Sequence, residues 1–122
     1  MKSVYIRRMH LAFGRVAALA FALAGCIPEC GQRQRLAKVD LVQLKDATQL
    51  FYHTMRKWPS SLQEMAPPSC HGSSCTLREL HNDPWGHPYV LIVKTERITV
   101  RSMGGDGRAG GEDDLQVVVW QQ

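Results

Sequence analysis

The first 25 residues of this 122-residue chain contain no acidic side chain and no apolar run of the ~20 residues that a membrane-spanning helix needs. Their apolar stretch, residues 16–25, is about ten residues long. Four basic residues come before it: Lys2, Arg7, Arg8 and Arg15. A basic start followed by a short apolar run is typical of an export signal, so residues 1–25 are predicted to be a signal peptide.

The rest of the chain has no excess of charge of either sign. The whole chain carries 15 Lys and Arg against 11 Asp and Glu, and its pI is about 9.1. Without the four basic residues of the signal, 11 basic residues face 11 acidic ones. No basic block with interleaved aromatic side chains follows, although contact with a phosphate backbone needs clustered Lys and Arg. We therefore expect no nucleic-acid partner.

The sequence also lacks the spacings of common catalytic and phosphate-binding sites. It has no Gly-Lys-Ser/Thr phosphate loop and no D-x-[DN]-x-[DN]-G calcium loop, and no Ser or Cys lies in a recognisable nucleophile elbow. Four histidines stand apart from any acid–nucleophile pattern: His53, His71, His81 and His87. We therefore expect neither catalysis nor a small-molecule substrate.

The end of the predicted signal, Leu23-Ala24-Gly25-Cys26, resembles the lipobox of bacterial lipoproteins. In those proteins small residues fit the signal peptidase and the cysteine receives the lipid, which makes Cys26 the predicted lipidation site. Ordinary cleavage after Ala24 is the alternative. Ile27, in place of Asp, is similar to lipoproteins that reach an outer membrane. We expect a lipid-anchored envelope protein that faces the periplasm, at the outer membrane rather than the inner one.

Export implies an oxidising compartment, in which cysteines pair. Cys70 and Cys75 flank a short, flexible stretch and are predicted to form a disulfide. The alternative is zinc bound by both cysteines together with His71 and His81, although no second C-x-x-C or H-x-x-x-H accompanies these cysteines. Cys30 is left over if Cys26 carries lipid, and is then free or paired between chains. It pairs with Cys26 if the lipobox interpretation is wrong.

A short linker, residues 26–35, is predicted to lead into one domain, residues 36–122. Apolar side chains recur at steps of three and four between Ala37 and Trp58, which predicts an amphipathic helix with one core-facing stripe. Pro59 is expected to end this helix, because proline lacks an N–H and restricts the residue before it.

The second half of the domain has the shorter period of strands. Runs rich in β-branched residues at 89–94 and 98–102 predict an antiparallel hairpin, and residues 116–120 predict a third strand. Asp83-Pro84-Trp85-Gly86 has the signature of a type I turn. The predicted fold is therefore α+β: one N-terminal amphipathic helix packed on a small three-stranded antiparallel sheet.

An ordered set of short motifs resembles the C-terminal domain of the type II secretion major pseudopilin. The resemblance covers about residues 36 to 120, and the order makes the set specific. His87 stands where that family often has Asn. The motifs are Trp58-Pro59, Asp83-Pro84-Trp85-Gly86-His87-Pro88-Tyr89, Ser102-Met103-Gly104-Gly105-Asp106-Gly107, Asp113-Asp114-Leu115 and Trp120.

The resemblance implies a calcium-binding loop between the last two strands. In those pseudopilins the corresponding loop binds Ca²⁺. Carried over by position, Asp106, Asp113 and Asp114 would give carboxylates, and Met103 and Gly111 would give backbone carbonyls. This agrees with the chemistry of the residues, because Ca²⁺ takes about six to eight oxygen ligands and glycines let the backbone turn inward. The alternative is a disordered glycine-rich turn without metal.

The start of the chain departs from the pseudopilin pattern. Pseudopilins begin with a cleaved basic leader and a Gly-Phe-Thr-Leu-x-Glu start of a long hydrophobic helix that packs the filament core. Phe13-Gly14-Arg15 does not match this start. We therefore expect a lipid-anchored, calcium-binding accessory of a type II secretion-like system, with secretion-machinery or pseudopilus proteins as partners. The alternatives are a genuine pseudopilus subunit with a diverged or misassigned N-terminus, and a free-standing envelope calcium-binding module.

Overall fold

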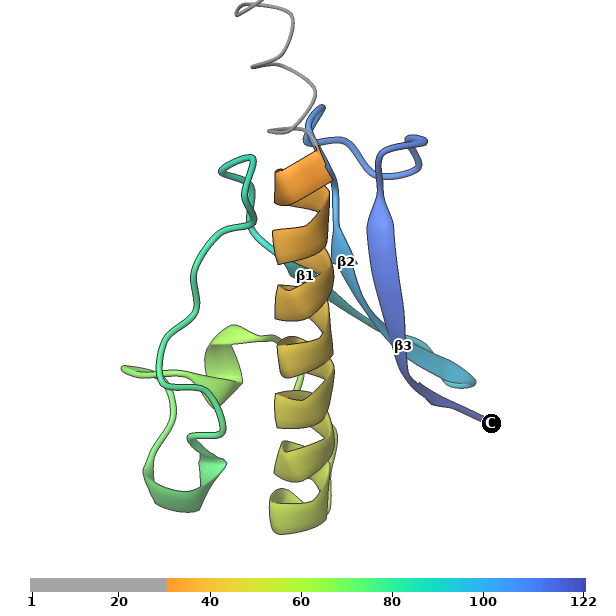
Figure 1. Ribbon diagram of the computed structural model, residues 1–122. Helices are drawn as coiled ribbons and strands as arrows, with labels where there is room; N and C mark the ends of the chain where they lie inside the picture. Colours follow the sequence, from red (N-terminus) through yellow and green to blue (C-terminus); the bar gives the residue numbers. More distant parts are fainter. Residues whose placement is uncertain (1–30) are drawn as a thin grey trace, which may run out of the picture. The chain divides into compact units, whose positions relative to one another are not determined.

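The computed structural model describes residues 31–122. The predicted signal peptide, Cys26 and Cys30 lie outside the described residues. Residues 34–122 form one unit. It starts with a long helix and ends with a three-stranded sheet, and a connection with two short 3-10 helices lies between them (Figure 1). The short helices are η1 (Gln63–Met65) and η2 (Gly72–Ser74).

The long helix covers residues 31–55 of the described chain. The predicted apolar stripe is the buried face of the helix from Ala37 to Phe51, where the exposed fraction is at most 6%, at Leu44. It does not continue to the end of the helix, because Met55 is 37% exposed. The helix already includes residues 31–35, which are mostly polar and gave no periodic signal. The predicted end at Trp58 is wrong, because Arg56 takes a left-handed conformation (φ 57°) and closes the helix through its N–H to the Tyr52 carbonyl at 2.8 Å.

The sheet has the strand order β1-β2-β3, and both pairs are antiparallel. The strands are β1 (Val90–Val93), β2 (Arg97–Ser102) and β3 (Leu115–Gln121). A tight turn joins β1 to β2, and a bulge lies between Ile98 and Thr99 where β2 pairs with β3. The predicted hairpin and third strand are thereby confirmed.

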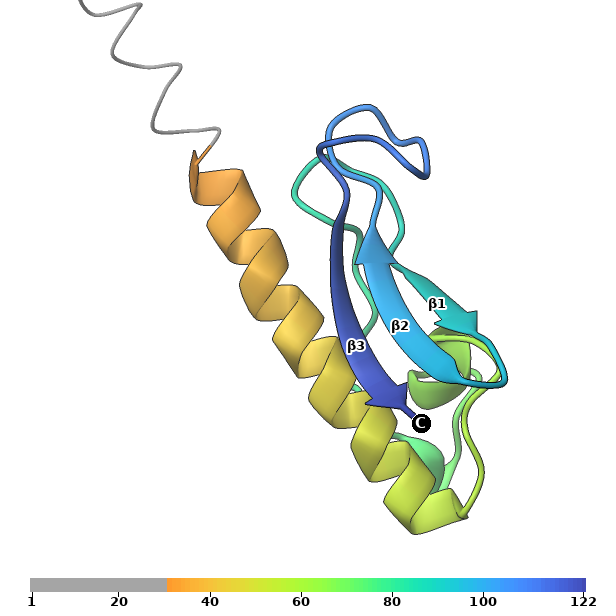
Figure 2. The same ribbon diagram turned by 90° about the vertical axis from the view of Figure 1, so that its right-hand side faces the viewer.

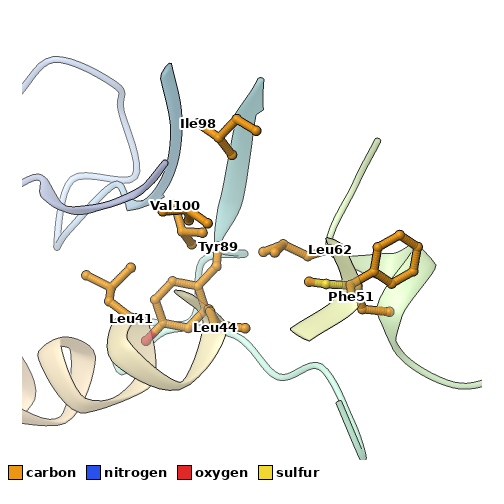
Figure 3. Packing of buried hydrophobic residues seen from close by; sticks show 9 residues of the cluster. Leu41, Leu44, Phe51, Leu62, Tyr89, Ile98 and Val100 are labelled. Carbon is orange, nitrogen blue, oxygen red and sulfur yellow. The ribbon is translucent and has the colours of Figure 1, made fainter. Parts of the chain in front are cut away.

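The helix packs on one face of the sheet, as Figure 2 shows, and the core lies between them. Figure 3 shows Tyr89 beside Leu41 and Leu44 of the helix, with Val100 of β2 on its other side. The Gln49 side chain adds a polar link, because its amide donates to the Val119 carbonyl of β3 at 2.9 Å. The predicted α+β arrangement of one helix on a three-stranded antiparallel sheet is correct.

Tyr89 also ties the end of the connection to the helix. Its hydroxyl donates to Asp40 Oδ2 at 2.7 Å, and His81 Nε2 lies 3.5 Å from the same carboxylate oxygen. Burial raises the pKa of Tyr89 above its usual range, and the hydrogen bond to Asp40 acts in the same direction. The neutral phenol is therefore the form that the folded domain stabilises.

A disulfide closes the connection between residues 70 and 75. The structure joins Cys70 to Cys75, and Cys70 is buried. Paired sulfurs cannot serve as zinc thiolates, so this arrangement favours the predicted disulfide over the zinc alternative. Within residues 31–122 no helix is both long and apolar enough to span a membrane.

Candidate metal centre

The predicted calcium loop is the segment 103–114 that connects β2 to β3 (Figure 1). Its two ends lie side by side, because Ser102 at the end of β2 pairs in register with Leu115 at the start of β3. The sheet therefore closes the loop at its base, and acids that are distant in the sequence return to the same place.

Asp106, Asp113 and Asp114 converge in this loop. One carboxylate oxygen from each lies within 4.8 Å of those of the other two. Asp113 and Asp114 are half-buried and Asp106 is exposed, while the neighbouring Glu112 points to solvent. The structure thus brings together the three carboxylates that the resemblance implied.

Backbone N–H groups of the loop hold one oxygen of each carboxylate. The N–H of Asp106 donates to Asp113 Oδ2 at 3.0 Å, and that of Arg108 donates to Asp106 Oδ1 at 2.9 Å. Gly110 donates to Asp114 Oδ2 at 2.6 Å. Each side chain is oriented by the loop itself and has a second oxygen for another partner.

The second oxygens of Asp106 and Asp113 face Gly111. A Cβ at Gly111 would lie 2.7 Å from Asp113 Oδ1 and 2.9 Å from Asp106 Oδ2. Gly104 abuts the other side of Asp113, where a Cβ would overlap its backbone carbonyl oxygen, and its φ of 66° favours glycine as well. Glycine at these two positions is what lets the backbone approach the carboxylates.

The remaining oxygen of the cluster, Asp114 Oδ1, is buried and has no hydrogen-bond partner within the described residues. Such a group costs about 1–3 kcal/mol when it stays unsatisfied. No basic side chain neutralises the cluster in residues 31–122, because the ion pairs there are Lys57–Glu64 and His81–Asp40. Three oxygen donors with uncompensated charge suit a hard divalent cation such as Ca²⁺.

The structure supports one of the two predicted carbonyl ligands, Gly111, and does not test the other, Met103. Gly111 lies among the carboxylates, and its carbonyl accepts the Asp114 N–H at 3.2 Å, which leaves it a second lone pair. Met103 is half-buried at the start of the loop, and its role as a ligand stays a prediction.

Sequence reasoning missed the buried Asp83, which supports the loop from the predicted turn. The turn itself forms, with the Gly86 N–H donating to the Asp83 carbonyl at 2.9 Å. The Asp83 side chain, in a residue only 4% exposed, accepts the N–H groups of Trp85 and His87 at Oδ1 and the Ser102 hydroxyl at Oδ2. An Asp at the first turn position predicts the local bonds, but nothing in the sequence places Ser102 beside it.

The fold is that of a pseudopilin head. The chain aligns with the crystal structure of the major pseudopilin from the type 2 secretion system of enterohaemorrhagic Escherichia coli with a TM-score of 0.61. The alignment covers 73% of this chain and 89% of the other at 24% sequence identity, which at this level establishes the fold.

Sequence comparison gives the family. The profile described as "Type II secretion system (T2SS), protein G" matches residues 30–120. The chain is 30% identical over 94 residues to the type II secretion system core protein G of Aeromonas hydrophila, across 67% of this chain and 66% of that protein. It is 28% identical over 99 residues to the protein of the same name from Pectobacterium carotovorum subsp. carotovorum, across 71% and 63%.

The chain therefore belongs to the type II secretion system protein G family, the major pseudopilins, and the resemblance seen in the sequence is confirmed. It spans just under two thirds of the length of these curated relatives. Members of this family are structural components of a secretion system rather than enzymes.

Proposed function

We propose that residues 31–122 form a calcium-binding pseudopilin-like head, attached to the cell envelope by a lipid on Cys26, that acts as an accessory of a type II secretion-like system. Its partners are secretion-machinery or pseudopilus proteins, which it contacts on the periplasmic side. The lipobox-like stretch that ends at Cys26 supports the anchor, and Ile27 supports an outer-membrane location.

The convergence of three carboxylates, one of which has a buried oxygen without a hydrogen-bond partner, supports the calcium site. Calcium would supply the positive charge and the oxygen coordination that the cluster lacks. Asp106, Asp113 and Asp114 would bind it, helped by the carbonyls of Met103 and Gly111. Because Asp106 lies near the start of the loop and Asp113 near its end, binding would hold the two halves of the loop together.

Thermal unfolding with calcium and with chelator tests the site. Extracellular calcium modules bind in the ~10⁻⁴–10⁻³ M range, so calcium at about ten times its Kd would stabilise the domain by about 1.4 kcal/mol. Asp114→Asn should abolish the difference in melting temperature between calcium and chelator. Glu112→Gln is the matched control, because it removes the same charge from an exposed neighbour and should leave the difference intact. Equal melting curves for the wild type in both conditions would contradict calcium binding.

Detergent partitioning tests the anchor. The wild-type protein should enter the detergent phase, and Cys26→Ser should stay unprocessed by the lipoprotein peptidase. Cys30→Ser, four residues further on, is the matched control and should behave as the wild type. A water-soluble mature wild-type protein would rule out the lipid anchor.

A second candidate is a genuine pseudopilus subunit. It is favoured by the family match, which spans residues 30–120 and so includes the long helix and the sheet, and by the name "core protein" of the curated relatives. Deletion of the gene and recovery of sheared filaments separate the two. The accessory role predicts that deletion impairs export while pseudopili are still present. Recovery of this chain as a regular, repeating subunit of the filaments would instead establish the subunit role.

A further inference from the structure

His87 lies against the backbone of the metal loop. Its ring nitrogen Nδ1 is 2.9 Å from the carbonyl oxygen of Gly104. On the other side, a Cβ at Gly107 would lie 2.7 Å from His87 Nε2. The half-buried imidazole thus fills the space between two points of the loop that are three residues apart.

The chemistry of this contact sets the direction of the hydrogen bond. A carbonyl oxygen can only accept, so Nδ1 carries the hydrogen and donates to Gly104. The backbone of His87 is held in turn by Asp83: its N–H donates to Asp83 Oδ1 at 2.8 Å, and its carbonyl accepts the Asp83 N–H at 2.7 Å. The ring therefore projects from a fixed base.

Each of the two glycines beside the ring lies next to one aspartate of the carboxylate cluster. Gly104 abuts the backbone and the side chain of Asp113, and Gly107 follows Asp106 in the chain. A shift of either glycine would move one carboxylate relative to the other. No other histidine of residues 31–122 makes a hydrogen bond or close contact of this kind with the loop.

We propose that His87 is a positioning residue for the metal loop, which holds Gly104 and Gly107 in the places that keep Asp113 and Asp106 converged. This inference rests on the proposed calcium binding. Losing the bond and the packing of the ring should weaken calcium binding about 3–10-fold, which is the range expected for one hydrogen bond and its contacts.

Two measurements on the purified full chain test it. The first is the calcium Kd from calorimetric titration. The second is the rate of native-state tryptic cleavage after Arg108, an exposed residue in the loop, measured in chelator so that it needs no metal. His87→Ala should weaken calcium binding by the stated factor and speed cleavage after Arg108 about as much, without a matching increase after Lys57, far from the loop in the chain.

Two further variants sharpen the test. His87→Asn keeps a donor near the position of Nδ1 but lacks the ring, so it should bind calcium about 2–3-fold more weakly than the wild type, and it remains informative if His87→Ala fails to fold. His53→Ala removes an exposed histidine from the long helix and should change neither quantity.

The outcomes separate this inference from the proposed function. Wild-type protein that binds calcium, with His87→Ala and His87→Asn matching it in Kd and in cleavage after Arg108, would overturn the role of His87 and leave the calcium site standing. Faster cleavage at all sites alike would also overturn it, because the effect would then be global. Wild-type protein that binds no calcium would refute the calcium site, and the positioning role with it.

Discussion

Replacing Asp83 by alanine is expected to cost the domain about 3–5 kcal/mol of unfolding free energy. The carboxylate accepts three hydrogen bonds, from Trp85 N at 3.1 Å, His87 N at 2.8 Å and Ser102 Oγ at 2.7 Å. A hydrogen bond to a charged group contributes about 1.5–3 kcal/mol. Ser102 is fully buried and cannot find water, whereas the two turn N–H groups are half-buried and partly can, so the three contributions do not add in full.

Asparagine at the same position is expected to cost less, about 1–2 kcal/mol. Its amide oxygen can still accept the two N–H groups of the turn, and its NH₂ can donate to the Ser102 hydroxyl in place of accepting from it. Because Ser102 Oγ also accepts the Gly104 N–H at 3.3 Å, both Asp83 variants should weaken calcium binding too.

Urea denaturation followed by circular dichroism measures these costs, and Asp83→Ala with Ser102→Ala completes a double-mutant cycle. The cycle should give a coupling energy of at least about 1 kcal/mol. An Asp83→Ala variant within about 1 kcal/mol of the wild type would show that the buried carboxylate has no net stabilising role.

Three further substitutions test the core, Tyr89 and the disulfide through their effect on the stability of the domain. Phe51→Ala, at a residue 1% exposed in the core, should destabilise the domain by about 3–5 kcal/mol in urea denaturation. The raised pKa of Tyr89 contributes stability that is fully present below about pH 10 and is lost as the pH rises above it, so Tyr89→Phe should flatten the alkaline decline of stability. The Cys70→Ser/Cys75→Ser double variant should lose about 2 kcal/mol, the chain-entropy value for so short a loop, and reductant should lower the wild type by the same amount.

The pattern of apolar and polar residues along the chain was enough to predict the helix, the three strands and their order. The stripe from Ala37 to Phe51 is buried as expected, because a period near 3.6 leaves few other ways to hide that face. The strands were found to within a residue at each end. The end of the helix was misplaced, because Arg56 adopts a left-handed conformation, which a residue other than glycine rarely takes. The helix therefore ends before Trp58, the residue whose conformation Pro59 restricts.

The acids of the loop could be predicted because they are contiguous with recognisable motifs. The contacts that support them could not. Asp83 and Ser102 are 19 residues apart, and His87 and Gly104 are 17 apart, so their meeting depends on how the turn packs on the end of β2. Only the three-dimensional structure reveals that the turn at residues 83–86, predicted from its backbone signature, also supports the loop at residues 103–114.

Calorimetric titration of the purified protein with calcium decides whether this loop is a calcium site. We expect one ion to bind per chain with a Kd in the ~10⁻⁴–10⁻³ M range. Asp113→Asn should abolish binding, and Glu112→Gln should preserve it. Absence of binding by the wild type at millimolar calcium, or undiminished binding by Asp113→Asn, would contradict the assignment of this loop as a calcium site.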